Sequence, residues 1–237
     1  MRHNLVLEDG EQIPAILTLP KSDAPVPAAV LLHGFSSRKE QMADSVGRAL
    51  ERLGIASLAI DLPLHGAREQ GVEGLSIRSP LALVQKWRLA VREGHQSLRF
   101  LAGHGAIDST RIGIVGYSLG AYLTVAIAAD NRVVRAVVLA AGGDLPERTP
   151  FAALVRTIAD PIGAVRALSG RPLLMVNGRL DRTIQPSQAT ALFDAAGEPK
   201  EIRWYQGGHW PPARAIDDAA EWLASRLKDD RAQARMA

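Results

Sequence analysis

Ser118 lies midway between two glycines, Gly116 and Gly120, in the stretch IGIVGYSLGAYL that spans residues 112–123. An apolar, β-branched run ends at the first glycine and a helical segment follows the serine, so the pattern predicts a buried strand, a sharp turn and a helix. The glycines would leave room where strand and helix nearly touch, and the turn would expose the hydroxyl at the carboxyl edge of a sheet. This placement, beside the positive end of a helix, is typical of a serine that acts as a nucleophile.

The same pattern is the G-x-S-x-G nucleophile elbow, and in it the chain resembles the α/β-hydrolase fold family. In that family an acid and then a histidine follow the serine, each on a loop after a later strand. The stretch PLLMVNGRLDRTI offers Asp181 after one strand-like run, and WYQGGHWPP offers His209 after the next. A serine hydroxyl needs a base within reach and a group that orients the base. The resemblance therefore implies a triad of Ser118, His209 and Asp181. The structural alternatives are a capping role for Asp181 and a structural role for His209 in its glycine turn.

A second motif, HGFSS, begins at His33 directly after the apolar run AAVLL. It matches the H-G motif with which many members of that family start their oxyanion loop. The match implies that the imidazole of His33 has a structural role and that the backbone N–H groups of Phe35 and Leu119 form an oxyanion hole. The segment DLPLHG resembles a D-x-P-x-H-G stretch of such hydrolases, in which Asp61 and His65 build the loop. The alternative is a zinc site made by the two histidines and Asp61, although these residues lack the close ligand pairs of known zinc patterns.

The elements that must position these residues are short apolar runs that alternate with longer segments of helical period. Strands are predicted at residues 13–20, 28–33, 55–61, 111–117, 133–141, 172–178 and 201–206, and helices at 38–53, 80–102, 119–129, 186–196 and 213–228. This order predicts an α/β protein with a doubly wound, mostly parallel sheet, the α/β-hydrolase fold, and the first strand could belong to an antiparallel hairpin at one edge. The chain is expected to form one domain over residues 1–237. Two stretches, 66–80 and 142–170, interrupt the alternation, and the second is expected to be a short cap insertion.

Composition restricts the partners of the protein. Apolar residues make up 47% of the 237, charged residues 22%, and the formal charge of +3 is spread without a long basic run, so nucleic acid is not expected. Because the chain contains no cysteine, disulfides and thiolate metal sites are impossible. No apolar stretch approaches twenty residues and the start of the chain becomes acidic early, so we expect a cytoplasmic protein without membrane contact.

The motif arrangement is most similar to the dienelactone-hydrolase-like and small carboxylesterase branch. Ser118 stands where true dienelactone hydrolases use cysteine, so that particular activity is not expected. The resemblance implies hydrolysis of a small-molecule carboxylic ester through an acyl-enzyme, without cofactor or metal. Few aromatic residues could line the site and the expected cap is short, so short-chain esters are favoured. The aromatic candidates are Phe35, Tyr117, Phe151 and Trp210, and the last three are the expected substrate contacts. The alternatives are an acylaminoacyl-type peptidase or amidase and a non-catalytic small-molecule-binding protein with the same fold.

Overall fold

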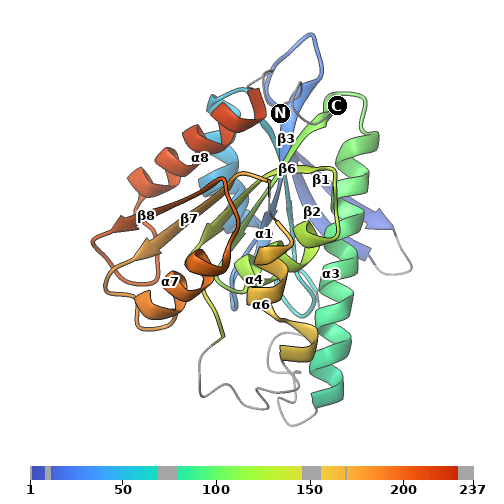
Figure 1. Ribbon diagram of the computed structural model, residues 1–237. Coiled ribbons are helices and arrows are strands. Elements are labelled where there is room, and N and C mark those ends of the chain that lie inside the picture. Colours follow the sequence, from blue (N-terminus) through green and yellow to red (C-terminus); the bar gives the residue numbers. More distant parts are fainter. Residues whose placement is uncertain (1, 9–11, 69–79, 146–155, 169, 229–237) are drawn as a thin grey trace.

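The computed structural model describes residues 2–8, 12–68, 80–145, 156–168 and 170–228, which form a central sheet covered by helices (Figure 1). The strands are β1 (Arg2–Glu8), β2 (Gln12–Thr18), β3 (Val26–Leu32), β4 (Ala56–Ile60), β5 (Ile107–Tyr117), β6 (Val134–Ala140), β7 (Leu173–Gly178) and β8 (Lys200–Tyr205). The helices are α1 (Lys39–Met42), the π-helical segment η1 (Ala43–Gly47), α2 (Arg48–Arg52), α3 (Pro80–Gly103), α4 (Leu119–Ala129), α6 (Pro161–Arg166), α7 (Pro186–Ala195) and α8 (Ala213–Lys228).

The sheet of the described residues has eight strands in the order β1-β2-β4-β3-β5-β6-β7-β8. From β4 to β8 all neighbouring strands are parallel. The strand β2 runs antiparallel to both β1 and β4, so β1 and β2 form a hairpin at one edge. The predicted mostly parallel sheet and the predicted edge hairpin are confirmed.

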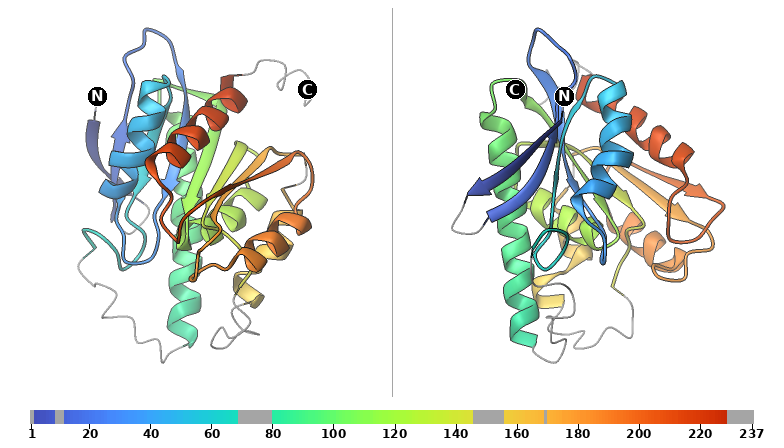
Figure 2. Two further views of the ribbon diagram at one scale, coloured as in Figure 1. Left: turned by 90° about the vertical axis from the view of Figure 1, so that its left-hand side faces the viewer. Right: turned by 180° about the vertical axis from the view of Figure 1, so that it is seen from behind.

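Helices cover both faces of this sheet, which explains why its inner strands are apolar throughout. The segment α1–η1–α2 and helix α8 lie on one face, and α3, α4, α6 and α7 lie on the other (Figure 2). In β3, Val30 and Leu32 pack into the core under α3 and α4, whereas Ala29 and Leu31 pack into the core under α1–η1–α2 and α8. A strand buried on both sides needs apolar side chains at every position, because no position faces water.

Parts of the predicted organisation lie outside the described residues. Of the stretch expected to form a cap, residues 146–155 and 169 are not described, and Phe151 is among them. The cap and the single domain therefore stay predictions. None of the described helices is both long and apolar enough to span a membrane.

Candidate active site

Ser118 occupies a strained turn between two elements. Strand β5 ends at Tyr117 and helix α4 begins at Leu119, and between them Ser118 has φ 52° and ψ −111°. A positive φ is unfavourable for a residue with a side chain, so the surrounding contacts must hold this conformation. The Ser118 N–H donates to the carbonyl of Ala140 at 2.9 Å, and the Ser118 carbonyl accepts the N–H of Ala121 at 2.9 Å. The turn is thus tied to strand β6 on one side and to the first turn of α4 on the other.

The two glycines beside Ser118 lie where no side chain fits. A Cβ atom added to Gly116 would overlap the carbonyl oxygen of Gly120 and the hydroxyl of Thr124. A Cβ atom added to Gly120 would overlap the carbonyl group of Leu32 at the end of β3. The predicted close approach of strand and helix is therefore present, and both glycines are required by contact with backbone atoms.

The structure brings Ser118, His209 and Asp181 together. Asp181 lies three residues beyond the end of β7, and His209 lies four residues beyond the end of β8. The distance from His209 Nε2 to Ser118 Oγ is 2.9 Å, and the distance from His209 Nδ1 to Asp181 Oδ2 is 2.8 Å. These separations allow a proton to pass from the hydroxyl to the imidazole.

The hydrogen bonds of Asp181 determine which ring nitrogen of His209 carries the proton. The Asp181 side chain is fully buried, and its Oδ1 atom accepts the backbone N–H groups of Thr183 at 2.8 Å and Ile184 at 3.0 Å. An ionised carboxylate only accepts hydrogen bonds, so the partner atom of its Oδ2, the Nδ1 of His209, carries the proton. In the neutral imidazole Nε2 then has a free lone pair that faces Ser118.

The loop that carries His209 is held by Tyr205, a residue the sequence analysis did not identify. The Tyr205 hydroxyl donates to the carbonyls of Gly208 at 3.0 Å and His209 at 3.2 Å. Burial, with a smaller contribution from the charge of Asp181, raises the pKa of Tyr205 to about 12, so the hydroxyl stays protonated. The local sequence pattern carries no signal that this hydroxyl would meet these two carbonyls.

The predicted oxyanion loop lies directly against Ser118. A Cβ atom added to Gly34 would come within 3.3 Å of Ser118 Cβ and 2.8 Å of the Tyr117 ring. The backbone N–H groups of Phe35 and Leu119 donate no hydrogen bond to any other residue that the structure describes. Within the described part of the chain both groups are thus unpaired, as the predicted oxyanion hole requires.

The imidazole of His33 fastens this loop from within. Its Nδ1–H donates to the Gly34 carbonyl at 2.7 Å, and its Nε2 accepts the N–H of Leu62 at 3.0 Å. Burial lowers the pKa of His33 to about 4, despite the opposing hydrogen bond to Gly34. The ring is therefore neutral near pH 7, and each nitrogen already has a backbone partner.

The neighbouring loop is held by a buried ion pair. Asp61 accepts the Lys39 backbone N–H at 2.8 Å and the Lys39 ammonium at 2.7 Å, while the ring of His65 packs edge-on against that of His33. Among the described residues, histidine, aspartate and glutamate side chains form no group of three that could hold a metal ion. The zinc alternative for His33, Asp61 and His65 therefore has no site in the described structure.

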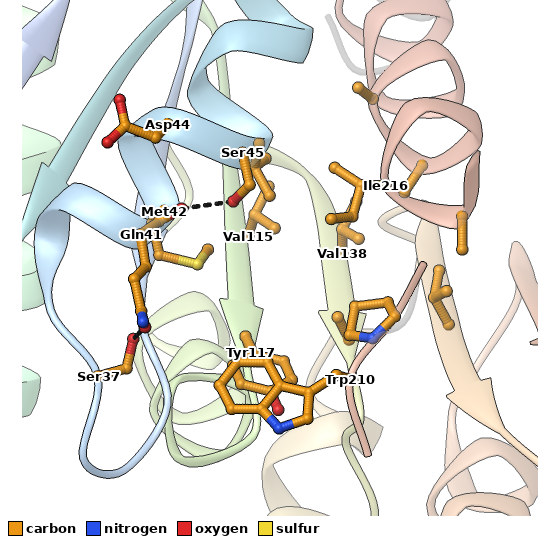
Figure 3. A pocket seen from close by; sticks show the side chains of 17 residues that line it. Ser37, Gln41, Met42, Asp44, Ser45, Val115, Tyr117, Val138, Trp210 and Ile216 are labelled. Carbon is orange, nitrogen blue, oxygen red and sulfur yellow. Dashed lines mark hydrogen bonds between the residues drawn. The ribbon is translucent and has the colours of Figure 1, made fainter. Parts of the chain in front are cut away.

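Two of the predicted substrate-contacting residues lie beside the triad. The Tyr117 ring is 5.3 Å from the His209 ring and 4.9 Å from the Trp210 ring, measured between centroids. Trp210 is 63% exposed although it is a large apolar residue. Both rings border an apolar cavity of about 330 Å³ between η1 and α8 (Figure 3). Phe151, the third predicted residue, lies outside the described part of the chain.

Some curated proteins are similar in sequence to part of this chain. The polyketide transferase ATR5 of Stachybotrys chlorohalonatus is 30% identical over 182 residues, which cover 76% of this chain and 53% of that protein. The chain spans about half the length of the curated relatives it matches. Their full activities therefore do not transfer directly to it.

Solved structures share the fold at low sequence identity. A cold-adapted esterase from an Arctic intertidal metagenomic library has a TM-score of 0.73 and 20% identity, with 96% of this chain and 93% of that chain covered. Acetyl xylan esterase 1 from Thermoanaerobacterium sp. has a TM-score of 0.74 and 21% identity, with 92% and 80% covered. Such similarity shows a common fold.

The family itself is shown by a match along most of the chain. The family model described as "Alpha/beta hydrolase family" matches residues 29–215, a range that begins in β3 and includes Ser118, Asp181 and His209. The predicted fold family is confirmed. The chain belongs to the alpha/beta hydrolase family.

Proposed function

We propose that this protein is a serine esterase that cleaves carboxylic esters through an acyl-enzyme on Ser118. The observation that carries the proposal is the continuous line of short contacts from Ser118 Oγ through the His209 ring to the buried carboxylate of Asp181. A strained serine, a base at hydrogen-bond distance and a group that orients the base are the parts that activate a hydroxyl.

In the first half of the reaction, Ser118 Oγ attacks the ester carbonyl while His209 Nε2 takes the hydroxyl proton. The carbonyl oxygen becomes negatively charged in the tetrahedral intermediate, and the backbone N–H groups of Phe35 and Leu119 are the proposed donors to it. Loss of one such donor typically lowers kcat by about 10²–10³. The intermediate then expels the alcohol, which receives the proton from His209.

In the second half, water replaces the alcohol. His209 takes a proton from the water, the resulting hydroxide attacks the acyl carbon, and Ser118 leaves with the proton returned by His209. The buried Asp181 carboxylate stabilises the imidazolium that forms in each half and keeps the ring in one orientation. These steps require only groups of the chain and water.

The substrates we propose are short-chain esters. The cavity next to Tyr117 and Trp210 has a volume of about 330 Å³, at the lower end of the range of about 300–1,000 Å³ for small-molecule sites. A dodecanoyl chain would need a longer apolar groove. We therefore expect acetyl and butyryl esters to be turned over faster than dodecanoyl esters.

The decisive experiment is the Ser118→Ala variant, with the exposed Ser109→Ala as a matched control. We expect Ser118→Ala to lower kcat for p-nitrophenyl butyrate by at least about 10⁴-fold, because the nucleophile is lost. A fluorophosphonate probe should label the wild type and Ser109→Ala but not Ser118→Ala. Retention of most of the activity or of the label in Ser118→Ala would refute the proposal.

A second candidate is acyl transfer to an alcohol in place of water. The relative from Stachybotrys chlorohalonatus bears the name of a transferase, and the same acyl-enzyme can be attacked by either acceptor. Product analysis in the presence of 1-butanol would separate the two reactions. Butyl ester in large excess over free acid would favour transfer, whereas free acid alone would favour hydrolysis.

A further inference from the structure

The cavity beside the triad is bordered by two helical segments and the sheet. Figure 3 shows Ser45 of the π-helical segment η1 on one side, Ile216 of α8 on the other, and Val115 and Val138 from strands β5 and β6 between them. Its volume is about 330 Å³. The rings of Tyr117 and Trp210 lie at one end.

Residues that hold the triad also line this cavity. Tyr117 and Trp210 both line it; the first immediately precedes Ser118 and the second immediately follows His209. Ala140, whose carbonyl accepts the Ser118 N–H, lines it as well. The cavity is therefore lined by residues that contact the triad, although Ser118, Asp181 and His209 are not themselves among its lining residues.

The chemistry of the walls favours a hydrocarbon. Polar groups lie along the α1–η1 side, and two of their hydroxyls are bonded within it: the hydroxyl of Ser37 donates to the side-chain carbonyl of Gln41, and the Ser45 hydroxyl donates to the Gln41 backbone carbonyl at 2.5 Å. Asp44 pairs with Arg48 at 3.2 Å. Apart from Tyr117 at the end of β5, the sheet and α8 contribute only apolar side chains to the lining. A ligand with many polar groups would find few partners here, whereas an apolar chain would leave water for an apolar surface.

Two local features border this space. The helical segment beside it passes through a π-helical turn, a rare geometry that occurs frequently at functional sites, and Asp44, Ser45 and Val46 of that turn line the cavity. On the opposite side, α8 presents the small residues Ala215 and Ala219. Larger side chains at these two positions would fill the cavity.

We infer that this cavity binds the hydrocarbon chain of the ester substrate. The inference rests on the proposed esterase function and extends it, because it names the part of the molecule that selects the substrate. The chain could belong to the acyl group or to the alcohol, and in both cases the recognition is burial of methylene groups against the valines of the sheet and α8. Each buried methylene is expected to raise kcat/KM by up to about fourfold until the cavity is full.

Two substrate series distinguish the acyl chain from the alcohol. The first series is p-nitrophenyl acetate, butyrate, hexanoate and octanoate, and the second is ethyl, butyl and hexyl acetate. In the wild type, kcat/KM should rise along one series until the added methylenes fill the cavity. A rise in the first places the acyl chain in the cavity, and a rise in the second places the alcohol there. No rise in either series would overturn the inference.

Substitutions in α8 test whether the hydrocarbon chain binds in this cavity. Ala219→Phe fills the cavity and should lower the ratio of kcat/KM for the longer to the shortest ester at least tenfold. Ala213→Phe makes the same change at an exposed position of the same helix that does not line the cavity, and it should leave the ratio at the wild-type value. An unchanged ratio in Ala219→Phe would overturn the inference.

A second variant covers the case in which Ala219→Phe does not fold. Ile216→Ala enlarges the cavity and should raise the ratio of octanoate to hexanoate turnover, or of hexyl to butyl acetate turnover, several-fold. An unchanged ratio would overturn the inference. Failure of the esterase proposal gives a different result, in which the wild type hydrolyses no ester and a fluorophosphonate does not label Ser118.

Discussion

Replacing Asp181 with asparagine removes the charge of the carboxylate but keeps its shape, and the surrounding donors determine how the new amide must lie. Oδ1 of Asp181 accepts the backbone N–H groups of Thr183 and Ile184. Only the carbonyl oxygen of an asparagine can take that place, so its NH₂ group must face His209. The ring then accepts at Nδ1 and carries its proton on Nε2. A protonated Nε2 cannot take the proton of Ser118.

The expected loss of activity is large compared with the loss of stability. The wrong tautomer in a serine triad lowers kcat by about 10⁴-fold, which corresponds to about 5 kcal/mol of transition-state stabilisation. The two backbone N–H groups keep an oxygen acceptor, although hydrogen bonds to a neutral acceptor are weaker than those to a charged one. We therefore expect the free energy of unfolding to fall by only about 1–3 kcal/mol.

Steady-state hydrolysis of p-nitrophenyl butyrate, together with urea unfolding, separates these two effects. The control is Asp217→Asn on the surface of α8, where the carboxylate pairs with Arg52 and half of the side chain is exposed. Such surface pairs contribute about 0–1 kcal/mol, so this control should keep normal kinetics. A folded Asp181→Asn variant whose kcat stays within tenfold of the wild type would refute the assigned role of the carboxylate.

The remaining predictions concern stability. Burial lowers the pKa of His33 to about 4 from an ordinary 6.5. Between these pH values the unfolded chain therefore binds a proton that the folded protein does not. The free energy of unfolding should fall by about 3 kcal/mol as the pH drops through this window. Urea unfolding at pH 7 and pH 4.5 should show a smaller decrease for His33→Asn than for wild type or for His104→Asn; equal decreases would contradict the prediction. Gly120→Ala would force a Cβ atom onto the carbonyl of Leu32, whereas at Gly105 an added Cβ meets nothing within 4 Å. Gly120→Ala should therefore lower the Tm far more than Gly105→Ala, and similar Tm values would show that the elbow tolerates a side chain.

Local patterns in the sequence were sufficient for most of the fold. Continuous apolar runs such as Val26–Leu32 indicate strands buried on both faces, and all the predicted strands and the long helices are present in the structure. Boundaries were less predictable. Strand β5 begins at Ile107, four residues before the predicted start, because its first part includes the polar and exposed Ser109 and Thr110, which carry no apolar signal.

The helix expected at 38–53 contains a π-helical turn that its composition does not indicate. A Cβ atom added to Gly47 would come within 3.0 Å of the Ser57 hydroxyl on β4. Gly47, the last residue of this turn, therefore lies close against the sheet, a contact between distant segments that the local sequence does not reveal.

The order of Ser118, Asp181 and His209 after successive strands was enough to predict that these residues approach one another, because parallel strands present their carboxyl ends at one edge. The supports of this arrangement were not predictable in the same way. Tyr205 reaches the carbonyls of Gly208 and His209 through a side-chain rotamer, and no spacing rule indicates where a hydroxyl will find an acceptor.

The cavity is the feature that sequence periodicity could predict least, and α8 shows why. Its apolar positions recur at three- and four-residue steps along the whole helix, which correctly predicts the face that turns toward the sheet. In the second half of that face Leu223 and Leu227 are buried in the core, whereas in the first half Ile216 and Ala219 border open space. The periodicity of the apolar residues specifies which face of α8 turns toward the sheet. Whether the space under that face is filled depends on the summed volume of side chains from β5, β6, η1 and α8. A packed core and a binding cavity therefore give the same pattern in this helix, and only a substitution that changes volume, such as Ala219→Phe, distinguishes them by its effect on substrate choice.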